Sequence, residues 1–366
     1  MSATADVRHL YVHVPFCAHR CGYCDFVTLV GRSAAHGEYV EALLRELELV
    51  RPLLAEPLAT VFVGGGTPTF TEASALGRLL SALPRAEETT VEANPETVSK
   101  DLARALARAG VTRVSLGAQS FQPHLLAVLE RRATPEAVRQ AFSLLRAASF
   151  DNISLDLLYG IPGQSPADLE RDLGEALALG PEHVSAYELE AKPGTRFSHA
   201  HGAELEGQAE AMEGYFERVV ATLVGAGYRW YETANFCRPG RESRHNLGYW
   251  LGHDYIGIGL GAVSTVRGRR WRNAPSLSRY TAALRAGGTP PREVEELDAA
   301  TRARERLMLA LRLDRPVALA DVREAVDLEG LDRAEALGLA AREEGRLRLT
   351  RRGRFLGGAV TAELMA

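Results

Sequence analysis

Three of the four cysteines lie close together, as Cys17, Cys21 and Cys24 in the segment CAHRCGYC. A chain of 366 residues with four cysteines is not a disulfide-stabilised scaffold, so these three are interpreted as ligands or reactive thiols. Their spacing puts three thiolates on one short loop, enough to hold a 4Fe-4S cluster and to leave one iron open. The fourth, Cys237, stands alone and is expected to be a small buried apolar residue.

A zinc site is the alternative for the same triplet, with His13 or His19 as the fourth ligand. Zinc sites built from cysteines usually come as two separated Cys-x2-Cys pairs, and the chain has no second pair. The tight triplet therefore favours the iron-sulfur cluster.

The elements that position the triplet follow a repeated pattern, because short β-branched runs each precede a stretch with helical periodicity. The six runs are LYVHVPF (10–16), TVFVGGG (60–66), TTVEAN (89–94), RVSLGAQS (113–120), ISLDLLYG (153–160) and HVSAYELE (183–190). Helix starts are marked by Thr134-Pro135 and Ser165-Pro166, where a capping hydroxyl precedes proline. Six strand-helix units predict a parallel sheet, either an open partial barrel or a doubly wound sheet.

In either arrangement chemistry is expected at the carboxyl ends of the strands. Unusual residues follow five of them: the cysteine loop, then GGGTPT, then Glu92-Ala93-Asn94-Pro95, then Gln119, then Asp156 with YGIPGQ. Five strand ends are therefore expected to face one cavity.

Beyond residue 228 the pattern changes, which predicts three parts: 1–228 as the repeated α/β unit, 229–296 as an extension packed on it, and 297–366 as a small winged-helix-like α+β domain with a β wing at RLRLT. Arginines and acidic residues nearly balance in this last part, so a structural or protein-contact role is favoured over DNA binding.

Bulk composition excludes several classes of function. The net charge is −4, no basic stripe is evident, and no apolar run is long enough to span a membrane. The first residues lack the features of a secretory signal. We expect a cytoplasmic protein with no nucleic-acid partner.

With these motifs in place, CAHRCGYC resembles the signature of the radical SAM superfamily, and GGGTPT resembles its glycine-rich segment beside the methionyl amine. The resemblance implies an α/β fold, a partial (β/α)6 barrel, in which the open iron binds S-adenosylmethionine (SAM) and an electron from the cluster cleaves it to a 5′-deoxyadenosyl radical. Further segments, including VEANPET, RVSLGAQSF, SLDLLYGIPGQ and DYIGIGLGA, are similar to the oxygen-independent coproporphyrinogen III oxidase group, especially its HemW-type heme-chaperone branch.

By that resemblance a set of residues matches positions that line SAM in the group: Tyr11, Tyr23, Gly65, Gly66, Thr67, Glu92, Gln119, Arg131 and Asp156. Their chemistry fits, because carboxylates accept hydrogen bonds from an ammonium group or ribose hydroxyls and a guanidinium neutralises a carboxylate.

Two departures from the oxidases favour the heme-chaperone branch. Phe26 stands where the oxidases have a further cysteine, and only about nine residues precede the first strand. The branch also has a His-Asn-x-x-Tyr-Trp segment associated with heme binding, present here as His245, Asn246, Tyr249 and Trp250. Imidazole is a good axial ligand of heme iron, and aromatic rings stack on a porphyrin.

The resemblance therefore implies a protein that binds heme and delivers it to acceptor proteins, with an electron donor for the cluster and membrane proximity only through an acceptor. The alternatives are the oxidase itself and a SAM-dependent enzyme that methylates heme or opens its ring. Many relatives carry histidines at about the places where Ala133 and Val263 stand here; if either histidine is a heme ligand in the relatives, heme coordination here is expected to be weaker or different.

Overall fold

A computed structural model describes residues 6–190 and 192–365. All six predicted strands are present and form parallel neighbours in one sheet. They are β1 (His9–Val14), β4 (Leu58–Gly65), β5 (Ala86–Ala93), β6 (Arg113–Gln119), β7 (Ile153–Tyr159) and β8 (His183–Glu188).

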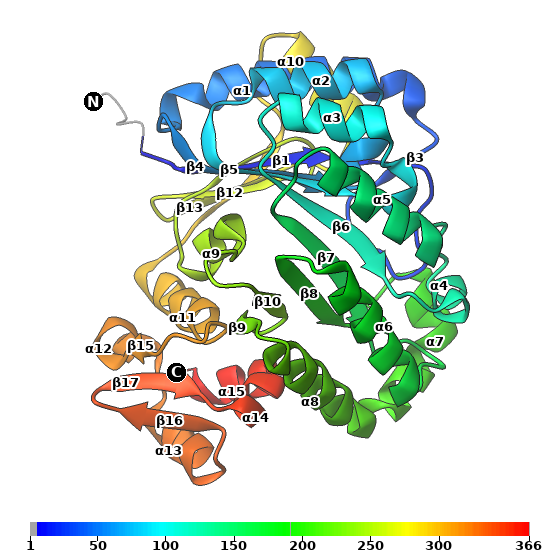
Figure 1. Ribbon diagram of the computed structural model, residues 1–366. Coiled ribbons are helices and arrows are strands. Elements are labelled where there is room, and N and C mark those ends of the chain that lie inside the picture. The colour runs from blue at the N-terminus through cyan, green and yellow to red at the C-terminus, as the bar shows by residue number, and fades with distance from the viewer. Residues whose placement is uncertain (1–5, 191, 366) are drawn as a thin grey trace.

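The order of these strands decides between the two predicted architectures. They run β1-β4-β5-β6-β7-β8 across the sheet, which is also their order along the chain. A doubly wound sheet reverses direction at a switch point, whereas a barrel adds each strand on the same side of the last. Right-handed crossovers then put the connecting helices on one face, and Figure 1 shows them covering the outside of a curved sheet.

The covering helices agree with the helical stretches of the sequence. Ser165 caps its helix with a capping box, and Thr134 accepts a hydrogen bond from the Ala137 amide, as the Thr-Pro and Ser-Pro starts predict. The helices are α1 (His36–Val50), α2 (Ala73–Ala82), α3 (Lys100–Arg108), α4 (Pro123–Val128), α5 (Pro135–Ala147), α6 (Pro166–Leu179), α7 (Arg196–Gly207) and α8 (Ala209–Gly225).

The strands separate an apolar shell from a polar interior because side chains alternate along each strand. On β6, Val114 and Leu116 belong to the main hydrophobic core, whereas Ser115 donates a hydrogen bond to Asp156 of β7. On β1, His9 bonds to Thr60 of β4 in the same way. The apolar side chains thus anchor the helices, and the concave face of the sheet is lined with polar groups.

Residues 229–296 contribute to both edges of this sheet. On one side β10 (Asn235–Cys237) pairs antiparallel with β8 and with β9 (Arg229–Glu232), and on the other side β11 (Ile256–Ile258) pairs parallel with β1. The helix α9 (Arg244–Trp250) lies on the concave side (Figure 1). The domain boundaries stay a prediction, but this segment adds strands to the sheet as well as packing on it.

The described chain also contains two three-stranded sheets. One is antiparallel, with β12 (Val263–Val266), β13 (Arg269–Asn273) and β14 (Arg292–Glu296), and α10 (Leu277–Arg285) lies between the last two in sequence. The other joins β15 (Val317–Ala318), β16 (Ala340–Glu343) and β17 (Arg346–Leu349). The expected wing at RLRLT is the β16–β17 hairpin.

The carboxyl-terminal part has a hydrophobic core of its own, built around residues such as Leu307, Leu331 and Leu347. Its helices are α11 (Ala299–Ala310), α12 (Leu319–Val322), α13 (Leu328–Ala336), α14 (Arg351–Phe355) and α15 (Gly357–Leu364). Helices combined with a small antiparallel sheet give the winged-helix-like form expected from the sequence.

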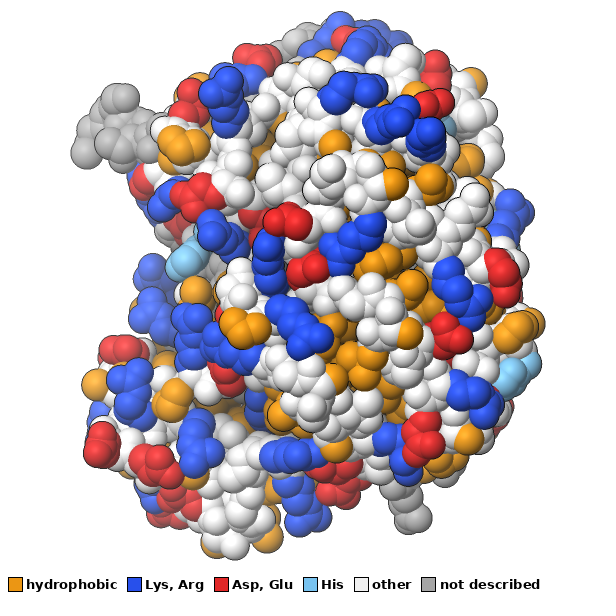
Figure 2. Space-filling view, viewed as in Figure 1, with side chains coloured by type: hydrophobic (Ala, Val, Ile, Leu, Met, Phe, Trp, Pro, Cys, Tyr) orange, Lys and Arg blue, Asp and Glu red, His pale blue; other side chains and the backbone are white. Residues whose placement is uncertain are grey.

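The surface viewed as in Figure 1 mixes charges of both signs, and Figure 2 shows basic and acidic side chains interspersed over it. Ion pairs such as Arg139–Glu175 and Arg229–Asp314 bring side chains of opposite charge together. In the described part of the chain, none of the helices has the length and hydropathy needed to cross a bilayer.

Candidate functional site

The cysteine loop begins directly after β1. Cys17 ends the short strand β2 (Phe16–Cys17), which pairs with β3 (Leu29–Val30) at the far end of the loop. The Cys24 amide donates to the Cys21 carbonyl at 3.2 Å, closing a tight turn between them. Cys17 is buried and the other two cysteines are half-buried, and Cys21 and Cys24 lie close enough to Cys17 to raise the pKa of its thiol.

Neither histidine that could complete a zinc site is placed to do so. His13 is buried, and its Nε2 lies 2.9 Å from the Val27 carbonyl, which can only accept, so Nε2 carries the proton. Its Nδ1 then accepts from the Tyr11 hydroxyl at 3.0 Å. His19 points toward Glu130, 3.9 Å away. Among the described side chains no three His, Cys, Asp or Glu converge as they would around a single metal ion.

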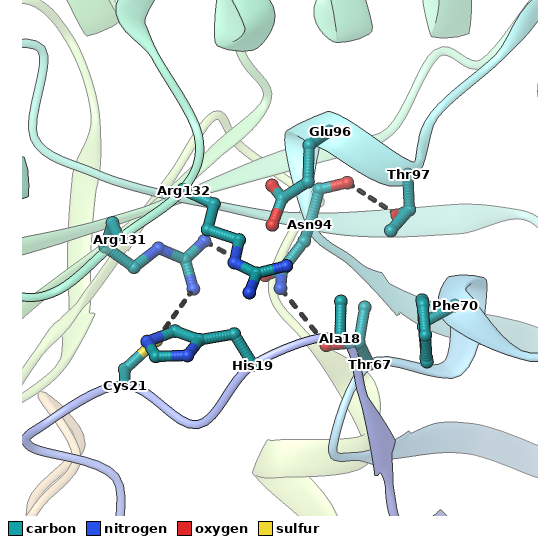
Figure 3. Close-up of a pocket in the computed structure, with 10 residues that line it drawn as sticks. All are labelled: Ala18, His19, Cys21, Thr67, Phe70, Asn94, Glu96, Thr97, Arg131 and Arg132. Carbon is teal, nitrogen blue, oxygen red and sulfur yellow. Dashed lines mark hydrogen bonds between the residues drawn. The ribbon is translucent and has the colours of Figure 1, made fainter. Parts of the chain in front are cut away.

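A chain of hydrogen bonds joins two of the cysteines through three other side chains, and Figure 3 shows the part from Thr67 to Cys21. The Thr67 hydroxyl donates to Cys17 Sγ at 3.5 Å and accepts from Asn94 Nδ2 at 3.1 Å. Asn94 Oδ1 accepts from Arg131 Nη2 at 3.0 Å, and Arg131 Nη1 donates to Cys21 Sγ at 3.7 Å. Donors aimed at sulfur are a means by which proteins tune iron-sulfur clusters.

The thiols suit a positively charged metal group and are not reactive by themselves. Burial raises the pKa of Cys17 to about 11, against the smaller lowering effect of the Thr67 hydrogen bond. Burial also raises the pKa of Cys24. Without a cation these groups stay protonated near neutral pH, and iron would displace the protons because the thiolate is the ligand. Three soft donors on one loop fit a 4Fe-4S cluster with one iron open.

The glycine triplet 64–66 lets β4 approach its neighbours closely. A Cβ on Gly64 would lie 2.7 Å from Glu92 Oε2, and one on Gly66 would lie 2.6 Å from the Pro15 carbonyl oxygen. Gly65 has φ +112°, a conformation that disfavours any side chain. The missing side chains thus make room for Glu92 and for the start of the cysteine loop, while the Gly65 amide donates to Glu92 at 3.0 Å.

Glu92 and Asp156 form an acidic pair inside the mouth of the barrel. Burial is the main cause that raises the pKa of Glu92 to about 7; the neighbouring Asp156 adds to the increase, and the Gly65 hydrogen bond opposes it. Burial also raises the pKa of Asp156, although hydrogen bonds from Ser185 and Ser115 oppose the shift. Such a pair is well suited to accept hydrogen bonds from a cationic or hydroxylated ligand.

Gln119 and Arg131 meet over Gly117 at the end of β6. A Cβ on Gly117 would lie 2.9 Å from Gln119 Nε2, 3.4 Å from Asn94 Oδ1 and 3.6 Å from Arg131 Nη2. The Gly117 carbonyl also accepts from Arg131 Nη2 at 2.8 Å. Three polar side chains can converge here only because this position has no side chain.

The residues expected around SAM are therefore brought together at the carboxyl ends of β1 and β4–β7. Tyr11 lies on β1 with its hydroxyl on His13, and Tyr23 packs from the cysteine loop against the small cluster that contains Leu125 and Leu158. Their assignment to a ligand stays a prediction.

The candidate heme segment, HNLGYW, lies in α9. His245 is 1% exposed, and both ring nitrogens are bonded: Nδ1 lies 2.7 Å from Thr60 Oγ1, and Nε2 lies 2.9 Å from the Tyr249 hydroxyl. Burial lowers the pKa of His245 to about 3, with smaller contributions from His9 and Arg113, so the ring is neutral. Ligation of iron by His245 would require one of these bonds to open.

The other two residues of the segment face different surroundings. Asn246 is half-buried, and its backbone amide donates a hydrogen bond to the hydroxyl of Ser243, the residue that caps α9. Trp250 lies under the Arg312 guanidinium, 4.4 Å from the ring centre, and its buried Nε1 has no partner within the described residues. Ala133 is buried and Val263 is half-buried, and neither side chain has an atom that could ligate iron.

An aromatic layer lies between the two groups of residues. The His245 ring stacks on Phe62 at 5.1 Å between ring centres and lies 6.5 Å from Tyr11. The cysteine loop and acidic pair therefore occupy one end of the polar interior, and α9 fills the other.

Two residues of this interior were not singled out from the sequence. Asn94 connects Thr67 with Arg131, and its place two residues after Glu92 at a strand end was the available signal. Arg113 is 2% exposed, and its Nε finds no hydrogen-bond partner in residues 6–190 and 192–365. A basic residue opening the otherwise apolar run RVSLGAQ was the signal for it.

Comparison with known proteins agrees with this geometry. Residues 11–176 match the radical SAM superfamily model, and residues 297–356 match the HemN C-terminal domain. The heme chaperone HemW of Mycobacterium tuberculosis is 38% identical, over 97% of this chain and 94% of its own. The chain belongs to the HemW family of radical SAM proteins. HemW of Bacillus subtilis is 34% identical, over 97% and 98% of the two chains.

Among solved structures, the coproporphyrinogen III oxidase HemN of Escherichia coli superimposes with a TM-score of 0.81, over 97% of this chain and 89% of that chain. At 22% identity this likeness shows the fold alone. Membership of the superfamily implies a 4Fe-4S cluster and SAM as cofactors, and the three thiols and the acidic pair fit these groups.

Proposed function

We propose that this chain is a heme chaperone: a radical SAM 4Fe-4S protein that binds heme and delivers it to acceptor proteins. The observation that carries the proposal is the similarity to HemW over nearly the whole of both chains. Phe26 supports it, because the position where the oxidases have a further cysteine is here an exposed phenylalanine.

Cys17, Cys21 and Cys24 would hold the cluster, with Thr67 and Arg131 donating to two of the sulfurs. A reduced cluster would supply the one electron that cleaves the sulfonium of bound SAM. Glu92 and Asp156 would accept hydrogen bonds from the ligand, and Arg131 would neutralise its carboxylate. Gly65, Gly66, Gln119, Tyr11 and Tyr23 would complete the lining.

For heme we propose α9 as the binding segment, with His245, Asn246, Tyr249 and Trp250 as its contacts. The neutral His245 ring supports this role, since only an unprotonated nitrogen can bind iron. Because Tyr249 occupies Nε2, binding through that nitrogen would have to displace the tyrosine hydroxyl.

The cofactor part is tested by anaerobic reconstitution followed by electron paramagnetic resonance. About four irons per chain are expected, lost when the three cysteines are replaced by alanine. SAM should change the spectrum of the reduced cluster. Zinc in place of iron, or a spectrum that saturating SAM leaves unchanged, would contradict this part.

The heme part is tested by titration in the Soret region with two variants. His245→Ala should shift the Soret band or weaken binding. His183→Ala is the matched control, because His183 is also buried, bonds to Ser154 and Tyr231, and lies outside the segment. Equal effects of both variants would point to a general loss of structure and would remove His245 as a ligand.

The acceptor of heme and the electron donor are further parts of the proposal, together with a cytoplasmic location. Each can be addressed by cell fractionation and by crosslinking heme-loaded protein in cells, with the triple cysteine variant as the comparison.

A further inference from the structure

The segment between Gln119 and Arg131 is held in a strained backbone conformation at both ends. Gln119 has φ +66° and Glu130 has φ +54°. Residues with a Cβ adopt this left-handed region rarely and at a cost in energy, so the surrounding structure has to impose it. Each strained position adjoins the candidate SAM site: Gln119 is part of it, and Glu130 immediately precedes Arg131.

A buried carboxylate holds the first of these ends. Asp172 lies on α6 and is 1% exposed. Its Oδ2 accepts from the Ser120 hydroxyl at 2.7 Å, and its Oδ1 accepts from the Phe121 amide at 2.7 Å and from Gln122 Nε2 at 3.0 Å. The three residues that follow Gln119 are therefore all fixed by one side chain.

The partners of Asp172 show that it is not one half of a salt bridge. In the described parts of the chain its three hydrogen-bond donors are all neutral, and no cation is among the groups that affect its pKa. Burying a carboxylate without a cation is unfavourable, and burial raises the pKa of Asp172. An apolar residue would serve better if the only need were to pack α6 against the sheet.

The register of β6 explains what the clamp achieves. The pairing of β6 with β7 is irregular between Gly117 and Gln119, so the strand bends just before the clamp. The bend brings the Gln119 amide over Gly117, beside Asn94 and Arg131. Loss of the clamp would let Gln119 relax toward an ordinary strand conformation and carry its amide away from this point.

We propose that Asp172 is a positioning residue for the SAM site, which acts by holding Ser120–Gln122 so that Gln119 keeps its left-handed conformation. The inference rests on the proposed SAM site and names the residue outside it that sets its geometry. Asp172 touches no ligand in this account.

The experiment measures SAM affinity by calorimetry on anaerobically reconstituted full-length protein, at a temperature where each variant is folded by circular dichroism. Asp172→Ala is expected to weaken SAM binding by about tenfold or more. Asp172→Asn keeps one acceptor for the Phe121 amide and should show a smaller loss. Asp168→Ala is the matched control, because Asp168 lies one turn earlier on α6 and caps the helix without bonding Ser120–Gln122.

A double-mutant cycle with Gln119→Ala separates positioning from general destabilisation. If Asp172 acts through Gln119, Asp172→Ala should cost much less SAM affinity in the Gln119→Ala background than in the wild type. Equal losses in both backgrounds, or an equal loss for Asp168→Ala, would overturn the inference. If the wild type itself binds no SAM, the proposed function fails instead, so the two failures are distinguishable.

Discussion

Arg131 donates a hydrogen bond to Cys21 Sγ at 3.7 Å while the same guanidinium bonds to Asn94 at 3.0 Å and to the Gly117 carbonyl at 2.8 Å. One side chain thereby joins the cysteine loop to the ends of β5 and β6. In the proposed site, its positive charge would neutralise the carboxylate of the ligand.

Replacing Arg131 by methionine should preserve the cluster and weaken SAM binding by about tenfold to a hundredfold, because a buried charge-assisted hydrogen bond is lost. Iron analysis and calorimetry measure the two effects. Arg132→Met is the control, since Arg132 is the next residue and lines the same pocket (Figure 3). Similar losses in both variants would mean that only the overall charge of the mouth matters.

Glu92 should make SAM binding depend on pH. Its pKa is about 7 in the folded chain, so the carboxylate that accepts hydrogen bonds forms as the pH rises through this value. Binding is expected to strengthen between about pH 6 and pH 8 in the wild type. Glu92→Gln should bind weakly at every pH in this range. A pH-independent affinity in the wild type would contradict the role of Glu92.

The same shift predicts an effect on stability. Because the folded pKa is raised above the ordinary value of 4.5, ionisation of Glu92 costs more free energy in the folded chain than in the unfolded chain. Glu92 therefore destabilises the fold most above about pH 7 and has no such effect below about pH 4.5. Glu92→Gln should therefore stabilise the SAM-free protein by about 2 kcal/mol at pH 8 and by little at pH 5. Denaturant unfolding at the two pH values measures this, and a destabilised variant at pH 8 would contradict it.

Thr67→Val removes the hydroxyl that bonds to Cys17 Sγ and to Asn94. We expect a lower reduction potential of the cluster, because a hydrogen bond to sulfur favours the reduced, more negative state. The free energy of unfolding should fall by about 1 kcal/mol. Spectroelectrochemistry tests the first expectation, with Thr69→Val as the control, since the Thr69 hydroxyl bonds to Thr97 and, among the described residues, to no cysteine.

A buried network behind the cysteine loop predicts a larger effect on stability. Glu46 is fully buried and accepts from the Gly259 amide, Tyr280 and Asn273, with Arg292 as its ion-pair partner at 3.3 Å. Glu46→Ala should lower the free energy of unfolding by about 3 kcal/mol, because buried donors lose their acceptor.

Glu48→Ala is the matched control for that network. Glu48 lies on the same helix but is exposed, and its pair with Arg51 is worth less than about 1 kcal/mol. Urea unfolding of the two variants should separate them clearly, and equal effects would show that the Glu46 network contributes no more than a surface pair.

The repeated strands were predictable from the sequence because each carries a β-branched run that ends in glycine or polar residues. It was harder to predict from the sequence which side chains face the interior. Both faces of these strands are buried, and polarity alone marks the inner face. Arg113 and Asn94 show this: each interacts with residues far away in sequence, and the motifs that contain them gave neither a role of its own.

The other features that could not be predicted from the sequence depend on contacts between distant segments. The choice between a barrel and a doubly wound sheet depended on strand order, which periodicity does not encode. Residues 229–296 were expected to pack on the barrel, whereas β9, β10 and β11 extend its sheet through pairings that only the tertiary structure defines. The bond to Nδ1 of His245 likewise comes from Thr60, far earlier in the chain, whereas the bond to Nε2 comes from Tyr249 on the same helix.

The central claim is that this chain carries heme and does not decarboxylate a porphyrinogen. The most direct test incubates the reconstituted protein anaerobically with SAM and a reductant, adding heme to one sample and coproporphyrinogen III to the other, followed by chromatography with absorbance detection. The account predicts that heme co-elutes with the protein at micromolar concentration and that coproporphyrinogen III is recovered unchanged. Formation of protoporphyrinogen IX, or heme that elutes free of the protein, would contradict it.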